Sequence, residues 1–168
     1  MLNSIRFKTA IALGVCAAAF ATPATAGSAN ANLGVSATVN ANCSVTTNPV
    51  AFGAVDTLSA SPVLGTGSVE VTCTKNTGWT AAAGIGAGSG ATFATRRMTF
   101  SGNTLDYMLY RDSARTEIWG DGTSSTFTVA GTGSGAVQSF TVYGRVPGSQ
   151  TSAPAGAYAD TVAITITY

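Results

Sequence analysis

The chain has 168 residues, with eight basic and seven acidic side chains, three cysteines and no histidine. This balance provides no strongly basic surface for nucleic acid or an anionic membrane. The lack of histidine excludes Ser-His-Asp triads, histidine-based zinc sites and imidazole general bases. Charged residues make up only 9% of the chain, and a weakly charged, β-prone chain tends to associate.

Residues 1–26 have the pattern of a secretory signal peptide. Arg6 and Lys8 precede the apolar run 11–20, and Ala24-Thr25-Ala26 is a small-x-small cleavage site. The apolar run is too short to span a membrane comfortably. Cleavage after Ala26 leaves about 142 residues, enough for one domain with its own core. Six basic and seven acidic residues then remain, so we expect an exported domain with a net charge near −1.

The stretch from Gly27 to Cys43 alternates between small or polar residues and apolar ones, the period of a strand with one buried face. It is about three times the usual strand length of ~5–6 residues, and no turn signal occurs before Pro49. Two interpretations are open: one long first strand, or a free N-terminal strand followed by the first strand of the body. The apolar positions are Ala29, Ala31, Leu33, Val35, Ala37, Val39, Ala41 and Cys43.

The cysteines predict one disulfide. Cys16 is lost with the signal peptide, which leaves Cys43 and Cys73 as a pair in an oxidising compartment. Closing a loop of about thirty residues is worth roughly 3–4 kcal/mol in the chain-entropy model.

Beyond Cys43 the chain reads as short strands punctuated by Gly, Pro, Asn and Ser, with no convincing helix. This spacing of turn signals predicts an all-β sandwich of Greek-key type. Loops are expected at Ser59–Gly67 and Gly131–Gly135. The expected strands are Val50–Val55, Ser68–Thr74, Trp79–Ile85, Arg96–Phe100, Leu105–Tyr110, Phe127–Val129, Val137–Val146 and Tyr158–Tyr168, with a short segment at Ile118-Trp119.

The last predicted strand has nothing after it to pair with its far edge. Its apolar residues Val162, Ile164, Ile166 and Tyr168 alternate with small or polar ones. An unpaired edge of this kind is a liability unless something covers it. The spare N-terminal strand suits that role, in its own molecule or in a neighbour.

Candidate catalytic and binding features favour structural interpretations. The glycine-rich segment 86–91 fits a loose dinucleotide-binding pattern, but no helix follows it. Asp121-Gly122 lacks the further acidic ligands of a calcium loop. We therefore expect no enzymatic activity, no cofactor and no metal. Two clusters are assigned to surface ion pairs and to core packing, respectively: the charged group Asp106, Arg111, Asp112, Arg115 and Glu117, and the aromatic group Tyr107, Tyr110, Trp119 and Tyr143.

The mature chain resembles the spore coat protein U domain family along nearly its full length. More narrowly, it is similar to the major subunits of archaic chaperone–usher pili. The residues that carry the resemblance are Cys43, Phe52-Gly53, Val71-Thr72-Cys73-Thr74-Lys75, Arg97-Met98, Leu105-Asp106-Tyr107-Met108-Leu109-Tyr110, Trp119-Gly120-Asp121-Gly122, Val142-Tyr143-Gly144-Arg145-Val146-Pro147, Gly156-Ala157-Tyr158-Ala159-Asp160-Thr161-Val162 and Tyr168.

The resemblance implies an incomplete immunoglobulin-like sandwich that lacks its last strand. The N-terminal extension of one subunit would fill that gap in the next, by donor-strand complementation. Residues 27–39 would then be the donor strand, with Ala29, Ala31, Leu33, Val35 and Ala37 entering the acceptor groove, and 40–168 the pilin domain. Val162, Ile164, Ile166 and Tyr168 would line the acceptor groove and the contact with a periplasmic chaperone.

The function that follows is a secreted structural subunit polymerising into a thin surface pilus for attachment and biofilm formation. Its implied partners are copies of itself, the chaperone, an outer-membrane usher and other pilus subunits including a tip adhesin, but no nucleic acid. One alternative is a spore or outer coat protein built on the same domain. Another is a carbohydrate-binding or tip adhesin, which is expected to be about twice as long and to lack a donor strand.

Overall fold

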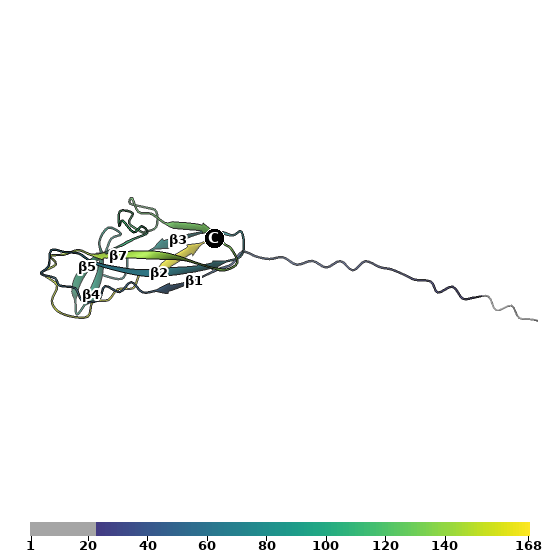
Figure 1. Ribbon diagram of the computed structural model, residues 1–168, viewed down its shortest axis with the longest axis horizontal. Helices are drawn as coiled ribbons and strands as arrows, with labels where there is room; N and C mark the ends of the chain where they lie inside the picture. Colours follow the sequence, from purple (N-terminus) through teal and green to yellow (C-terminus); the bar gives the residue numbers. More distant parts are fainter. Residues whose placement is uncertain (1–22) are drawn as a thin grey trace, which may run out of the picture. The chain divides into compact units, whose positions relative to one another are not determined.

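The computed structural model describes residues 23–168, so most of the predicted signal peptide lies outside the described residues (Figure 1). The chain divides between Ala37 and Thr38 into two units. Residues 23–42 form no strand, and the side chains of Leu33 and Val35 are 89% and 88% exposed. In the single chain the alternating run up to Val39 therefore has no strand partner, and its role as a donor strand stays a prediction. No helix of the described residues is long and apolar enough to cross a membrane.

Five antiparallel strands form the larger sheet of the body, in the order β1-β2-β7-β5-β4. β2 and β7 are its longest strands and pair from Val63↔Val146 to Thr72↔Val137. In β2 the alternating residues Val69, Val71 and Cys73 are buried, as the alternation of the sequence predicts. The strands are β1 (Cys43–Asn48), β2 (Val63–Cys73), β7 (Val137–Val146), β5 (Asn103–Tyr110) and β4 (Arg96–Phe100).

Three antiparallel strands form the second sheet, in the order β6-β3-β8. They are β6 (Val129–Thr132), β3 (Gly78–Ala83) and β8 (Ile164–Thr167). β8 pairs with β3 along one edge, from Thr80↔Thr167 to Ala83↔Ile164, and lies at the margin of its sheet. The prediction that the last strand has an unpaired far edge is therefore confirmed for the described chain.

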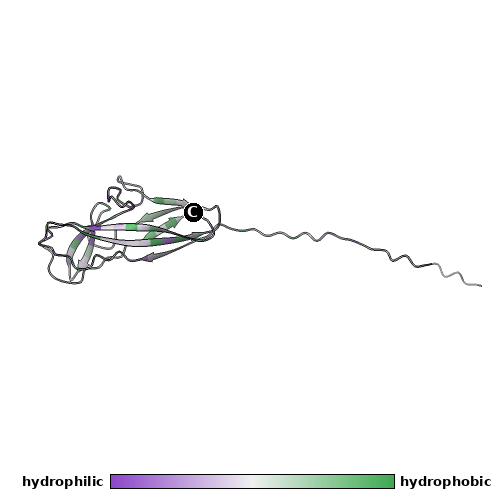
Figure 2. Cartoon of the chain, in the orientation of Figure 1, coloured by the Kyte–Doolittle hydropathy of each residue, from purple (hydrophilic) through white to green (hydrophobic). Residues whose placement is uncertain are grey.

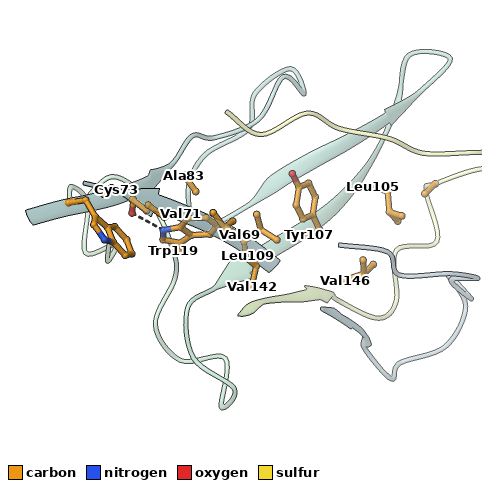
Figure 3. Close-up of a cluster of buried hydrophobic side chains, with 13 residues drawn as sticks. Val69, Val71, Cys73, Ala83, Leu105, Tyr107, Leu109, Trp119, Val142 and Val146 are labelled. Atoms are coloured by element: carbon orange, nitrogen blue, oxygen red, sulfur yellow. Dashed lines mark hydrogen bonds between the residues drawn. The ribbon is translucent and has the colours of Figure 1, made fainter. Parts of the chain in front are cut away.

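The hydrophobic core lies between the two sheets. Figure 3 shows its labelled side chains running from Cys73 at one end to Leu105 and Val146 at the other. Trp119 is 1% exposed, and its indole Nε1 donates a hydrogen bond to the Ala81 carbonyl oxygen at 3.1 Å. Hydrophobic colouring gathers on the strands of the body (Figure 2). The result is a helix-free antiparallel sandwich, which confirms the predicted fold class.

Several predicted boundaries are wrong. Val50–Val55 is not a strand, and the predicted loop Ser59–Gly67 contains the first residues of β2. The predicted glycine loop after Phe127 begins inside β6, and only Ile164–Thr167 of the final segment forms a strand. The first two errors share a cause. The chain after β1 crosses the inner face of β2, where a Cβ on Gly67 would lie 2.7 Å from the Asn48 carbonyl oxygen.

Candidate functional site: an open groove beside the last strand

A groove of about 420 Å³ opens between the segment that follows β1 and the segment that leads into β8. One rim consists of residues 47–52, and the other consists of residues 158–162 together with Ile164. The floor is core: Val69, Leu109 and Trp119 line the groove although each is at most 5% exposed. The groove therefore lies directly above the hydrophobic core, and its floor is formed by core side chains.

The groove continues past its first cavity. A second hollow of about 660 Å³ is lined by residues 50–58 and 153–158, and it shares Val50, Phe52, Met98 and Tyr158 with the first. Phe52 lines both hollows and packs edge-on against Tyr107 of the first, with ring centroids 6.2 Å apart. The two neighbouring hollows share part of their lining, and both apolar and polar residues line them.

Both rims carry backbone groups without a strand partner on the groove side. Residues 49–52 belong to no strand and appear in no β-ladder. The other rim is held from one side only: Ala159 exchanges two backbone hydrogen bonds with Thr99, at 2.8 and 3.2 Å, and Gly84 N donates to the Ala163 carbonyl oxygen at 2.9 Å. Backbone groups of the rims that lack a strand partner could pair with one further strand.

A polar cluster fixes the rim that precedes β8. The Asp160 carboxylate accepts hydrogen bonds from the Tyr107 hydroxyl at 2.6 Å and from the Ala87 backbone N–H at 2.8 Å. Burial, and then the hydrogen bond with Asp160, raise the pKa of Tyr107 above its usual value. Tyr107 therefore stays a neutral donor, and it ties the groove rim to β5.

The fully buried Arg96 supports the same region from behind. Its guanidinium donates to the carbonyl oxygens of Gly84 at 2.9 Å, Trp119 at 2.7 Å and Phe93 at 3.3 Å. Burial lowers the pKa of Arg96, while the nearby Tyr107 and Asp160 act in the opposite direction. Three loop segments are thereby joined at one side chain. The glycine-rich loop 86–91 is held by the Ala87 N–H bonded to Asp160 at 2.8 Å and by Arg97, which donates to the Ser89 carbonyl oxygen at 3.1 Å.

The structure brings together part of the predicted acceptor set. Val162 and Ile164 line the groove, whereas Ile166 packs against the core further along β8 and Tyr168 is 56% exposed beyond the end of the strand. Cys43 and Cys73 form a disulfide with an S–S distance of 2.02 Å. The predicted donor residues Ala29, Ala31, Leu33, Val35 and Ala37 are all exposed in the single chain. Their entry into a groove stays a proposal.

Sequence reasoning missed Phe52, Met98 and Asp160 as groove residues. Periodicity offers no signal for them, because they lie on different segments and only tertiary structure brings them together. Phe52 does stand out as a single aromatic residue between Pro49 and Gly53. That is a weak signal for a side chain inserted from a loop.

The candidate catalytic clusters have structural roles. The Asp112 carboxylate accepts backbone N–H groups of Thr116 and Glu117 at 2.8–3.1 Å, and Arg111 pairs with Glu117 at 2.8 Å. Tyr107, Tyr110 and Trp119 are at most 5% exposed, as expected for core packing. Within residues 23–168 no three His, Cys, Asp or Glu side chains gather in a way that would hold a metal ion.

An antiparallel sandwich of two sheets with an open groove beside its last strand defines a class of fold, the immunoglobulin-like sandwich. The chain belongs to the Spore Coat Protein U domain family, whose sequence model matches residues 29–165. It is 37% identical to "Protein U" of Myxococcus xanthus, in an alignment covering 99% of this chain and 100% of the relative.

A solved structure supports the fold. The chain is similar, with a TM-score of 0.56 and 20% identity, to a chain in the CsuC-CsuE chaperone–tip adhesion subunit pre-assembly complex from archaic chaperone-usher Csu pili of Acinetobacter baumannii. The match covers 78% of this chain and 40% of that one. At this identity the likeness establishes the fold, and the resemblance inferred from sequence motifs agrees with it.

Proposed function

We propose that this protein is an exported structural subunit that polymerises by donor-strand exchange into a thin surface pilus for attachment and biofilm formation. Residues 27–39 of one copy fill the groove of the next. Before assembly a periplasmic chaperone occupies the same groove, and an outer-membrane usher and other subunits, including a tip adhesin, complete the system. The protein acts by assembly and has no catalytic role.

The open groove is the observation that carries this proposal. Its floor consists of core residues and residues 49–52 of one rim lie in no strand, so it suits an extended segment with alternating apolar side chains. The same chain carries such a segment at its N-terminus, exposed and without a strand partner. Full burial of Leu33 and of Val35 would contribute roughly 1.5–3 kcal/mol each. This burial would favour binding of the extension in the groove.

A coat protein is the second candidate, and the comparisons favour it specifically. The family is described by its spore coat member, and "Protein U" of Myxococcus xanthus aligns along its whole length with this chain. The two functions differ in the final structure, which is a free fibre in one case and a layer on the cell or spore in the other.

Electron microscopy of producing cells, with and without the gene, tests the proposal. Cells with the gene should carry thin fibres that disappear on deletion, return on complementation, and bind antibody against the domain along their length. Antibody confined to a coat layer would support the coat function instead. Fibres that persist after deletion, without label, would contradict the pilus proposal.

A further inference from the structure

The junction between the extension and the body is held by one side chain, Thr74, at the end of β2. Its backbone N–H donates to the Asn42 carbonyl oxygen at 2.9 Å, and its hydroxyl oxygen accepts the Asn42 N–H at 3.1 Å. The same hydroxyl lies 3.3 Å from the Asn42 carbonyl oxygen and 3.4 Å from that of Asn40. The contact extends the β1–β2 ladder beyond the Cys43–Cys73 disulfide, which is its last paired position.

The number of hydrogen bonds that the Thr74 hydroxyl can make indicates which groups it binds. A threonine hydroxyl has one proton to donate and two lone pairs. The Asn42 carbonyl already accepts the Thr74 N–H. The hydroxyl proton is also within reach of the Asn40 carbonyl oxygen, for which no other hydrogen bond is found in the described part of the chain. Thr74 therefore bridges two alternate residues of the extension's base, and it does so immediately after the covalent link of Cys43 to Cys73.

We propose that Thr74 is a positioning residue that fixes the joint between consecutive subunits. This inference rests on the proposed function. If the donor strand ends at Val39 and the body holds Asn40 and Asn42, almost no free linker separates the groove of one subunit from the body of the next. A short, anchored connection gives a defined angle between neighbours, whereas even a few free residues behave as a flexible tether. The predicted fibre is stiff at each joint, and its stiffness depends on the Thr74 hydroxyl.

Thr74→Val tests the proposal because it keeps the size and β-branching of the side chain and removes only the hydroxyl. Thr74→Ser is the rescue variant, since it restores the hydroxyl. Thr72→Val is the matched control: it makes the same chemical change two residues earlier on β2, where the hydroxyl makes no hydrogen bond. The first measurement is hydrogen–deuterium exchange at the Asn42 amide of the secreted chain, in whichever assembly state it is purified.

Exchange at Asn42 should be about two- to ten-fold faster in Thr74→Val, as expected for one lost hydrogen bond, and unchanged in Thr74→Ser and Thr72→Val. The second measurement is the distribution of bend angles between neighbouring subunits in electron micrographs. Thr74→Val fibres should form in normal yield, with the same thermal stability and subunit spacing, but with a broader distribution of angles.

The outcomes separate the two claims. Unchanged exchange at Asn42 in Thr74→Val would overturn the inference whether or not fibres form. Faster exchange with unaltered bend angles would show that Thr74 holds the base of the extension without setting the joint, which also overturns it. If the wild-type chain forms no polymer under any condition, the proposed function fails, and the role at a joint fails with it.

Discussion

Replacing Val35 with aspartate should abolish polymerisation at neutral pH. Val35 is 88% exposed in the single chain, and the proposed donor strand would bury it over a floor that includes Val69, Leu109 and Trp119. The substitution removes a branched apolar group from that contact and puts a carboxylate in its place. Asn32→Asp is the matched control. Asn32 lies on the outward side of the alternation, and its replacement adds the same charge there.

Two contributions set the magnitude. Losing the buried valine costs about 2 kcal/mol. An unpaired carboxylate in an apolar groove is kept neutral, and raising its pKa by about three units costs about 4 kcal/mol near pH 7. The sum of about 6 kcal/mol weakens each joint by roughly four orders of magnitude. The control should change each joint by less than about 0.5 kcal/mol.

The assay is sedimentation of polymer from purified chains, followed between about pH 7 and pH 4. The protonation cost shrinks by about 1.4 kcal/mol per pH unit, so Val35→Asp polymer should reappear towards the ordinary aspartate pKa near 4. Val35→Asn, which cannot titrate, should show no such recovery. If Val35→Asp polymerises as well as Asn32→Asp at neutral pH, residues 27–39 do not enter the groove.

Three further predictions concern the body. Fusing a copy of Ala29–Val39 behind Tyr168 through a short Gly/Ser linker should fill the groove and raise the melting temperature, and an unfused monomer that melts as high as the fusion would show that the sandwich is already complete. Replacing both Cys43 and Cys73 with serine should lower the free energy of unfolding of that fusion by roughly 3–4 kcal/mol, because the disulfide closes a loop with a sequence separation of 30; an unchanged denaturation midpoint would contradict this. Because the pKa of Tyr107 is raised in the folded state, the unfolded state loses its proton first as pH rises. The free energy of unfolding should then fall by up to about 1.4 kcal/mol per pH unit above about pH 10, and Tyr107→Phe should remove that part of the slope.

Alternation predicted the strands that have partners within the chain. β7 was predicted at its observed boundaries, and β4 likewise, because their inward residues repeat every second position. β2 was recognised only from Ser68, since Gly65 and Gly67 interrupt the apolar pattern. Those glycines accommodate the backbone of residues 48–51: a Cβ on Gly65 would lie 2.8 Å from the Ala51 carbonyl oxygen. That requirement arises from a crossing between distant segments, which local sequence does not encode.

The two largest errors, Val50–Val55 and the first half of Tyr158–Tyr168, lie on opposite rims of the groove. Both segments have the composition of strands, but neither has a neighbouring strand on the groove side. High β-propensity does not by itself produce a β-strand, because each backbone N–H and C=O of a strand needs a hydrogen-bond partner on a neighbouring strand. The groove itself was expected from the resemblance and from the unpaired last strand, but Phe52, Met98 and Asp160 required the structure.

The position of the disulfide has a mechanical consequence. In the proposed fibre each subunit holds the next and the load is carried in series, so a pull on the extension reaches a body first at the Thr74 contacts and then at Cys43. An edge strand pulled from its end is peeled away one residue pair at a time, and β1 is such a strand, with β2 as its ladder partner. The first pair of that ladder is the covalent one, Cys43–Cys73, which passes the load directly to β2, a strand paired on both sides. In the proposed fibre, the disulfide would therefore oppose peeling of β1 from its Cys43 end.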